Sequence, residues 1–291
     1  MSAGSGTEYI HRERRGPTVI LTLDRPPVNV LSRPVLEELS RRLDEAEADP
    51  EARVVELTSA AAKAFAAGAD IKEMASLGPE EAHVHGARGQ SVTRRIERLP
   101  LPVIAAVHGV CLGGGCEIAL ACDFIVASED ATFGQPEINL GVMPGWGGTR
   151  RLPRRIGAVR ARRWILTGAP VPAPDALAAG LLDQVVPRAA LLDSALGLAA
   201  ELSKKPPIAL AAAKYALLNA IDPGIDAGLE YELGLWARLF GTEDQREGMR
   251  AFLEKRSLAE RVRNDWEHES AGFPWARGER RVRDGDGRKA E

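Results

Sequence analysis

The chain has 291 residues, of which 45% are hydrophobic, and carries a formal net charge of −3 at pH 7. A chain of this length and composition can bury a large core, which excludes a disordered protein. The slightly acidic balance gives no general attraction to nucleic acid or anionic lipid, so we expect neither as a partner. No apolar run approaches the roughly 18 residues of a membrane span, and residues 1–16 are polar. We therefore expect a cytoplasmic protein without membrane contact.

The first half of the chain predicts strands that alternate with helices. Residues 18–23 and 54–58 are apolar, β-branched runs bounded by turn residues, and we expect a strand at each. Between them, apolar residues recur on one helical face from Leu36 to Ala46, and Ser32 is a candidate N-cap. A strand, a helix and a second strand in this order indicate an α/β fold with buried parallel pairing.

The alternation continues, and then only helices follow. Further elements are expected as a helix over 79–99, a strand over 103–107, a helix over 118–122, a strand over 123–127, helices over 160–167 and 173–179, and a strand over 182–186. Beyond residue 190 we expect helices over 191–203, 208–219, 225–240 and 243–254. The pattern divides the chain into a core domain over 1–195, a helical region over 196–266, and a disordered, arginine-rich tail over 267–291.

Two segments place a carboxylate beside flexible backbone. The first runs from Gly113 through Gly114 to Glu117, directly after an apolar strand, and the second ends at Glu137. A glycine-rich turn from strand to helix offers free N–H groups at the positive end of a helix dipole, which can receive a developing oxyanion. Taken singly, each glutamate could be an ordinary structural carboxylate. Together with such donors, the two acids indicate acid/base chemistry.

Four segments resemble the crotonase (enoyl-CoA hydratase/isomerase) superfamily. They are residues 65–74, 102–122, 133–153 and 242–252, in this order and at compatible spacing. The resemblance implies an α/β, crotonase-like fold with a repeated ββα core. It also implies that the C-terminal helical region builds a homotrimer, or a hexamer made of two trimers.

The resemblance also implies a reaction and its residues. The N–H groups of Ala69 and Gly114 match the family's donors to the thioester oxygen of an acyl-CoA, where negative charge develops. Glu117 and Glu137 match the family's two catalytic glutamates. Glu117 would activate the water that attacks the β carbon, and Glu137 would deliver a proton to the α carbon. The implied activity is hydration of a trans-2-enoyl-CoA to a 3-hydroxyacyl-CoA.

Substrate contacts follow by the same resemblance. Lys72 matches a contact to the adenine and phosphate end of CoA, and Arg25 could add charge there. Trp146 stands where the family more often has a small residue, so its indole could shorten the acyl pocket. The implied CoA-binding residues are Ala67, Ala69, Asp70, Ile71, Lys72, Gly113, Gly114 and Arg25. No metal or redox cofactor is expected, because CoA enters as part of the substrate.

Other functions stay open at this stage. An isomerase, a dehydratase or an acyl-CoA hydrolase could use the same scaffold, and the acyl-chain length and the direction of reaction are not determined. Seven arginines between Arg150 and Arg163 could instead form an RNA-binding patch on a noncatalytic protein, although no aromatic stacking platform accompanies them. His83 and His85 lack a patterned third metal ligand, and the three cysteines are expected to be plain buried thiols.

Overall fold

The computed structural model describes residues 8–219, 229, 231, 233, 234, 236, 238–240, 242–256, 273 and 274. The chain divides into two compact units, residues 1–204 and 205–291. The expected boundary between residues 195 and 196 falls inside helix α7 (Leu191–Ser203), which belongs wholly to the first unit. Half of the expected helix over 225–240 and most of the expected tail over 267–291 lie outside the described residues.

A six-stranded sheet forms the centre of the first unit, with strand order β1-β2-β4-β7-β9-β12. All its pairings are parallel except that between β1 and β2, which confirms the expected α/β fold with parallel pairing. The strands are β1 (Ile10–Arg15), β2 (Thr18–Leu23), β4 (Val54–Ser59), β7 (Val103–Val107), β9 (Phe124–Ser128) and β12 (Gln184–Val186).

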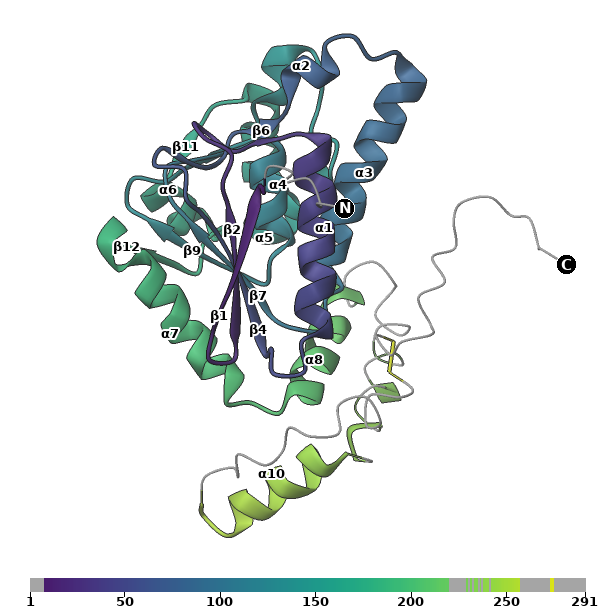
Figure 1. Ribbon diagram of the computed structural model, residues 1–291, viewed down its shortest axis with the longest axis vertical. Helices are drawn as coiled ribbons and strands as arrows, with labels where there is room; N and C mark the ends of the chain where they lie inside the picture. The colour runs from purple at the N-terminus through teal and green to yellow at the C-terminus, as the bar shows by residue number, and fades with distance from the viewer. Residues whose placement is uncertain are drawn as a thin grey trace, which may run out of the picture. The chain divides into compact units, whose positions relative to one another are not determined.

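Helices cover both faces of this sheet (Figure 1). On one face the main core packs against α1, α3 and α4, and on the other α7 packs against β4, β7 and β9. The helices of the first unit are α1 (Arg33–Ala48), α2 (Ile71–Met74), α3 (Pro79–Glu97), α4 (Gly114–Ala121), α5 (Gly148–Thr167), α6 (Ala173–Ala179) and α7, with 3-10 turns η1 (Pro136–Leu140) and η2 (Arg188–Ala190). Because both faces are covered, the central strands are apolar on both sides.

Short strands bring the glycine-rich segments together. A second sheet has the order β11-β10-β8-β5, and β3 pairs with β6. These strands are β3 (Val30–Leu31), β5 (Ala64–Ala66), β6 (Gly68–Ala69), β8 (Val110–Leu112), β10 (Thr132–Gly134) and β11 (Val171–Pro172). At two or three residues each, they are too short to show a period of two in the sequence, and they were not predicted.

The structure refines the sequence interpretation at three places. Ser32 is the N-cap residue of α1, but its side chain makes no capping hydrogen bond. The antiparallel strand β1 was missed because its residues are mostly charged. Helix α5 begins at Gly148, whereas the sequence predicted a helix only from residue 160. Its first half was missed because Gly157, with φ +78°, interrupts the helical backbone and the helical repeat of the sequence.

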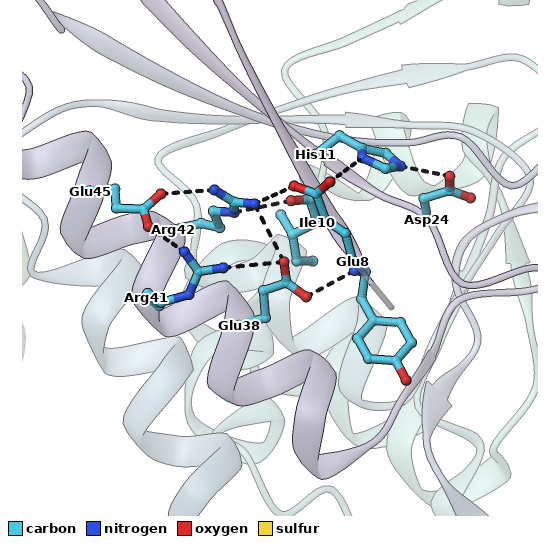
Figure 2. A network of polar contacts seen from close by, with 9 residues as sticks. Glu8, Ile10, His11, Asp24, Glu38, Arg41, Arg42 and Glu45 are labelled. Atoms are coloured by element: carbon cyan, nitrogen blue, oxygen red, sulfur yellow. Dashed lines mark hydrogen bonds and ion pairs between the residues drawn. The ribbon is translucent and has the colours of Figure 1, made fainter. Parts of the chain in front are cut away.

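Strand β1 is fastened to α1 by charged side chains (Figure 2). Arg42 of α1 donates to the carbonyl oxygen of Ile10 at 3.1 Å and also pairs with Glu8. Glu38 accepts a hydrogen bond from the Tyr9 N–H at 2.8 Å. The edge strand is therefore held by side chains of α1, and the sequence of the strand alone does not indicate these contacts.

One carboxyl group is buried without a partner inside the α/β unit. Glu56 in β4 is fully buried, and among the described residues neither of its carboxyl oxygens has a hydrogen-bond partner. Val54, two residues earlier in the same strand, packs against α7. Because side chains two residues apart in a strand point to the same face, Glu56 also faces α7. Burial raises the pKa of Glu56 to about 7, against a small opposing effect of Arg15.

The second unit contains α8 (Pro207–Asn219) and α10 (Glu243–Leu253). Ile208, Ala211 and Tyr215 of α8 form a small apolar cluster with Phe273. Both helices match predicted ones. None of the helices in the described part of the chain combines the length and apolar character needed to cross a bilayer.

Candidate active site

Glu117 lies in the first turn of α4 and is 2% exposed. Gly113, with φ +52°, makes the turn that leads into the helix. One residue into the helix, Gly115 lies so close to β5 that an ideal Cβ there would fall 2.2 Å from the carbonyl oxygen of Ala66. Only glycine permits this approach. The glycines of the turn therefore set Glu117 in the interior, against β5.

Backbone donors from one loop converge on Glu117. Its Oε1 accepts hydrogen bonds from the N–H groups of Trp146 and Gly148, each at 2.7 Å. Burial raises the pKa of Glu117, while these donors, the N–H of Gly147 and the charge of Arg151 oppose that rise. The group is thus buried and held in one orientation, and its charged form is stabilised by the loop.

Glu137 lies in η1 and is partly buried. An ideal Cβ on Gly113 would lie 3.2 Å from Glu137 Oε1, so the carboxyl group rests against the glycine turn. Its Oε2 is buried and has no hydrogen-bond partner among the described residues. Burial raises the pKa of Glu137 to about 7, and the negative charge of Glu117 contributes to the rise. The structure therefore brings both predicted glutamates to one place, in different environments.

The segments carrying the two expected oxyanion donors touch each other. An ideal Cβ on Gly68 would lie 3.2 Å from the carbonyl oxygen of Leu112 and 3.6 Å from the nitrogen of Gly114. Ala69 follows Gly68 directly. Gly114 is the first residue of α4, so its N–H finds no acceptor within the helix. The Ala69 and Gly114 segments thus form adjacent walls of the same corner.

Trp146 fills the space above this corner. Its indole is 4% exposed and lies against two glycines, since an ideal Cβ would fall 2.1 Å from the ring at Gly89 and 2.4 Å at Gly114. His85 of α3 is buried beside it, with ring centroids 6.0 Å apart. The expected acyl-pocket residue therefore lies beside the Gly114 donor.

The expected CoA-binding residues lie on and around α2. Asp70 caps this helix, accepting from the N–H of Lys72 at 3.0 Å, and forms an ion pair with Arg25 at 3.2 Å. Arg25 also donates to the Val30 carbonyl oxygen at 2.6 Å, so its guanidinium is already engaged within the protein. Ile71 and Lys72 are exposed. Gly113 lies against Gly68, since an ideal Cβ on Gly68 would fall 3.8 Å from Gly113 Cα, and Ala67 precedes Gly68 directly.

Of the seven dense arginines in α5, only Arg151 is buried, whereas Arg150, Arg160, Arg162 and Arg163 are exposed. Several of the seven nevertheless bond within the protein. Arg151 pairs with Glu97, Arg155 donates to the Cys122 carbonyl oxygen, and Arg160 donates to that of Ala179. These three stabilise helix contacts, which argues against an RNA-binding patch built from the whole run. The three cysteines Cys111, Cys116 and Cys122 are free and buried, as expected.

The sequence interpretation missed the supports of the two glutamates. The donors of residues 146–148 and the pairing of Arg151 with Glu97 were not predicted, because backbone groups and ion pairs between distant helices leave no local signal. Gln135 was also missed. Its side chain is fully buried, and neither polar atom of its amide has a partner in the described part of the chain. Its place two residues before Glu137 was the available hint.

Comparison with known proteins identifies the family of the chain. The sequence profile described as enoyl-CoA hydratase/isomerase matches residues 14–260. The chain is 41% identical over 247 residues to a short-chain-enoyl-CoA hydratase of Clostridium acetobutylicum, covering 84% of this chain and 95% of that protein. It is 40% identical over 250 residues to a crotonyl-CoA hydratase of Syntrophomonas wolfei, covering 86% and 96%.

A solved structure leads to the same assignment. The crystal structure of an enoyl-CoA hydratase from Bacillus anthracis superposes with a TM-score of 0.82 at 39% identity, covering 87% of this chain and 98% of that one. The range 14–260 matched by the family profile includes Glu117 and Glu137. The chain belongs to the enoyl-CoA hydratase/isomerase family and has its crotonase fold.

Proposed function

We propose that this protein is an enoyl-CoA hydratase that adds water across the 2,3 double bond of a trans-2-enoyl-CoA. The observation that carries the proposal is that Glu117, which is buried, and Glu137, which is partly buried, meet beside a glycine turn. The first N–H of the helix that follows this turn has no acceptor within the helix. Glu117 is bound by backbone donors, whereas one buried oxygen of Glu137 has no hydrogen-bond partner in the described part of the chain. Relatives named as hydratases at about 40% identity support it.

The environments of the two acids suit opposite roles. Glu117, surrounded by N–H donors and near Arg151, is the better carboxylate and would take a proton from the attacking water. Glu137, whose pKa is raised to about 7, would carry a proton at neutral pH and deliver it to the α carbon. Because each charge disfavours the other, the pair would hold about one proton near pH 7. That is the protonation state from which hydration can begin.

The proton balance closes over one turnover. Water gives its oxygen to the β carbon and one proton to Glu117, and Glu137 gives its proton to the α carbon. Glu117 then ends protonated and Glu137 ionised, and exchange with solvent returns the starting state. Charge that gathers on the thioester oxygen would be held by the N–H groups of Ala69 and Gly114. The reaction is redox-neutral, and the two carboxyl groups and the N–H donors would supply its acid, its base and its stabilisation of charge, so we propose no metal or redox cofactor.

Substrate binding would use the exposed face of α2. Lys72 is exposed and can meet a phosphate of CoA as a point charge, whereas Arg25 is paired with Asp70 and would act by holding that loop. Ala67, Ile71 and Gly113 would line the path from there to the thioester. Trp146 would bound the acyl group beside Gly114.

The direct experiment measures hydration of crotonyl-CoA by the full-length protein and by Glu117→Gln and Glu137→Gln variants. Loss of a positioned acid or base should lower kcat by about 10² to 10⁴ for each variant. Near-wild-type rates in both variants would contradict the mechanism. If the wild type hydrates no enoyl-CoA but shifts a 3-enoyl-CoA to the 2-enoyl isomer, the enzyme is an isomerase. If it does both and Glu117→Gln loses only hydration, the enzyme has both activities and isomerisation depends chiefly on Glu137.

We also propose that the protein assembles as a homotrimer or as a hexamer of two trimers. The second unit supports this, because Met249 and Leu253 of α10 are 50% and 79% exposed and would gain from burial against another subunit. Mass measurement by light scattering on the full-length protein distinguishes monomer, trimer and hexamer. A cytoplasmic location belongs to the same proposal, supported by the free, buried cysteines.

A further inference from the structure

The loop that holds Glu117 is itself held by a second set of contacts. The carbonyl oxygen of Trp146 accepts hydrogen bonds from Arg151 Nη1 and from Thr93 Oγ1, each at 2.9 Å. Arg151 belongs to α5 and Thr93 to α3, so both helices hold the same peptide group. A trans peptide directs its C=O and N–H in opposite directions. Anchoring the Trp146 carbonyl therefore also sets the direction of the Gly147 N–H, which stabilises the charged form of Glu117.

Arg151 is fixed before it reaches this carbonyl. Its Nε and Nη2 donate to the two carboxyl oxygens of Glu97 at 2.9 and 2.7 Å, a fork that fixes the plane of the guanidinium. Arg151 is 9% exposed, and Glu97 lies on α3 close to Thr93 in sequence. The third nitrogen, Nη1, is left to bind the loop.

The loop is shaped to receive this arginine. Gly147 has φ +114°, and an ideal Cβ there would lie 2.0 Å from Arg151 Nη1. A side chain at this position would displace the guanidinium. The carbonyl oxygen of Gly147 in turn accepts from the N–H of Arg151 at 2.9 Å. Arg151 therefore fits against Gly147 only because Gly147 has no side chain, and the two residues together fix the Trp146–Gly147 peptide.

We propose that Arg151, braced by Glu97, is a positioning residue for the proposed general base Glu117. Among the described contacts, Arg151 makes no hydrogen bond to Glu117, and the proposal gives it no contact with the substrate. Besides the effect of its charge on Glu117, it acts through the Trp146–Gly147 peptide and keeps the loop's N–H groups aimed at the carboxylate. The uncharged donor Thr93, on the same carbonyl oxygen, separates this positioning effect from the effect of charge. This inference rests on the proposed function only in naming Glu117 as a base, since the bracing contacts exist whatever the reaction.

The test combines a kinetic and a non-kinetic measurement on the full-length protein. The variants are Arg151→Met, Arg151→Lys and Glu97→Gln, with Arg162→Met as the control because Arg162 is exposed on the same helix. The kinetic readout is kcat/KM for crotonyl-CoA as a function of pH. The non-kinetic readout is the titration of the Glu117 carboxyl carbon by ¹³C NMR, assigned by its absence in Glu117→Gln.

Arg151→Met should lower kcat by about 10- to 100-fold, because misplacement of a reacting group by about 1 Å has effects of this size. The acidic limb of the pH profile, which reports ionisation of Glu117, should move to higher pH together with the NMR titration. The basic limb, assigned to Glu137, should stay in place. Arg151→Lys should recover part of the rate, and Glu97→Gln should move the acidic limb in the same direction but less. Arg162→Met should leave both readouts unchanged.

Failure can be recognised in each part. A folded Arg151→Met protein whose Glu117 titration stays at the wild-type position overturns the inference, as does an equal loss in Arg162→Met. If Arg151→Met does not fold, Thr93→Val removes the other donor to the same carbonyl with little change of shape, and an unmoved titration in both Thr93→Val and Glu97→Gln overturns it. If the wild type hydrates no enoyl-CoA, the proposed function fails while the NMR titration still decides the positioning role.

Discussion

The backbone of Gly89 in α3 lies directly against the indole of Trp146, so that an ideal Cβ on Gly89 would fall 2.1 Å from the ring. The loop whose N–H groups hold Glu117 is thereby locked to α3 by packing as well as by hydrogen bonds. Helix α3 contributes no reacting group, yet it determines where the tryptophan can lie. A single methyl group added at Gly89 would therefore push against the tryptophan ring.

Gly89→Ala should therefore destabilise the protein, although alanine is the better helix former. Overpacking typically costs about 1–3 kcal/mol, more than the roughly 0.5–1 kcal/mol that alanine gains over glycine in a helix. Gly86→Ala is the matched control, because it lies in the same helix with nothing within 4 Å of an ideal Cβ. Urea unfolding should show a loss for the first and a gain for the second.

A double variant identifies the cause. Trp146→Phe removes part of the ring that the new methyl group meets, so Gly89→Ala should cost less in that background than in the wild type. Coupling of this kind between contacting residues amounts to about 0.5–3 kcal/mol. Additive effects of the two substitutions would show that the strain arises elsewhere.

Trp146→Phe should also change the preference for acyl-chain length, if the indole bounds the acyl group as proposed. The smaller ring would admit longer chains, since a hydrophobic pocket discriminates by about tenfold or more per methylene. The measurement compares kcat/KM for four- and eight-carbon trans-2-enoyl-CoA substrates. The ratio should move toward the longer substrate, and an unchanged ratio would place the end of the acyl pocket elsewhere.

The pH dependence of hydration should show the titration of Glu137. The proposed acid must be protonated, and its pKa is raised to about 7 by burial and by the charge of Glu117. The value of kcat/KM should therefore fall as the pH rises above about 7. Glu137→Gln, measured with enough enzyme to detect its residual rate, should lack this limb. A wild-type rate that stays level up to pH 9 would assign the proton donor to another group.

The buried carboxyl group of Glu56 should make stability depend on pH. Its pKa rises from 4.5 in the unfolded chain to about 7 in the folded one, so the folded state binds the proton more tightly. The stabilisation is complete below pH 4.5 and is lost as the pH rises through about 7, with a size of at most about 3 kcal/mol.

Glu56→Gln keeps the shape and removes the titration. Relative to the wild type, the variant should gain stability at pH 8 and gain little at pH 5, as measured by urea unfolding at both values. Glu201→Gln, on the exposed side of α7, is the control and should parallel the wild type. Parallel curves for Glu56→Gln as well would mean that the group stays neutral throughout or is solvated when it ionises.

Two neighbouring arginines of α1 should differ in their effect on stability. Arg42→Met removes the bond to the Ile10 carbonyl oxygen and the pair with Glu8, so it releases the edge strand β1 and should cost about 1–3 kcal/mol. Arg41→Met removes only exposed pairs within α1, to Glu38 and Glu45, and should cost less than about 0.5 kcal/mol. Urea unfolding of both variants makes the comparison, and equal losses would contradict the role given to β1.

Many main elements were predictable from sequence because their physical causes are local. The apolar face of α1 repeats at helical spacing, and the strand over 103–107 is apolar throughout because both faces of the sheet are covered. Elements without a local cause were missed. Strand β1 is mostly charged, and the first half of α5 contains Pro153 and precedes the break at Gly157.

The sequence by itself determined the parallel α/β fold and, through the family resemblance, the pair Glu117 and Glu137. Both depend on residue types and spacings along the chain. Only the tertiary structure decided how that pair is held. The N–H groups of Trp146 and Gly148 bind Glu117, Glu97 braces Arg151, and one oxygen of Glu137 has no partner among the residues that the structure describes. These depend on burial and on contacts between groups 29 to 54 residues apart, and such contacts form only when the helices pack.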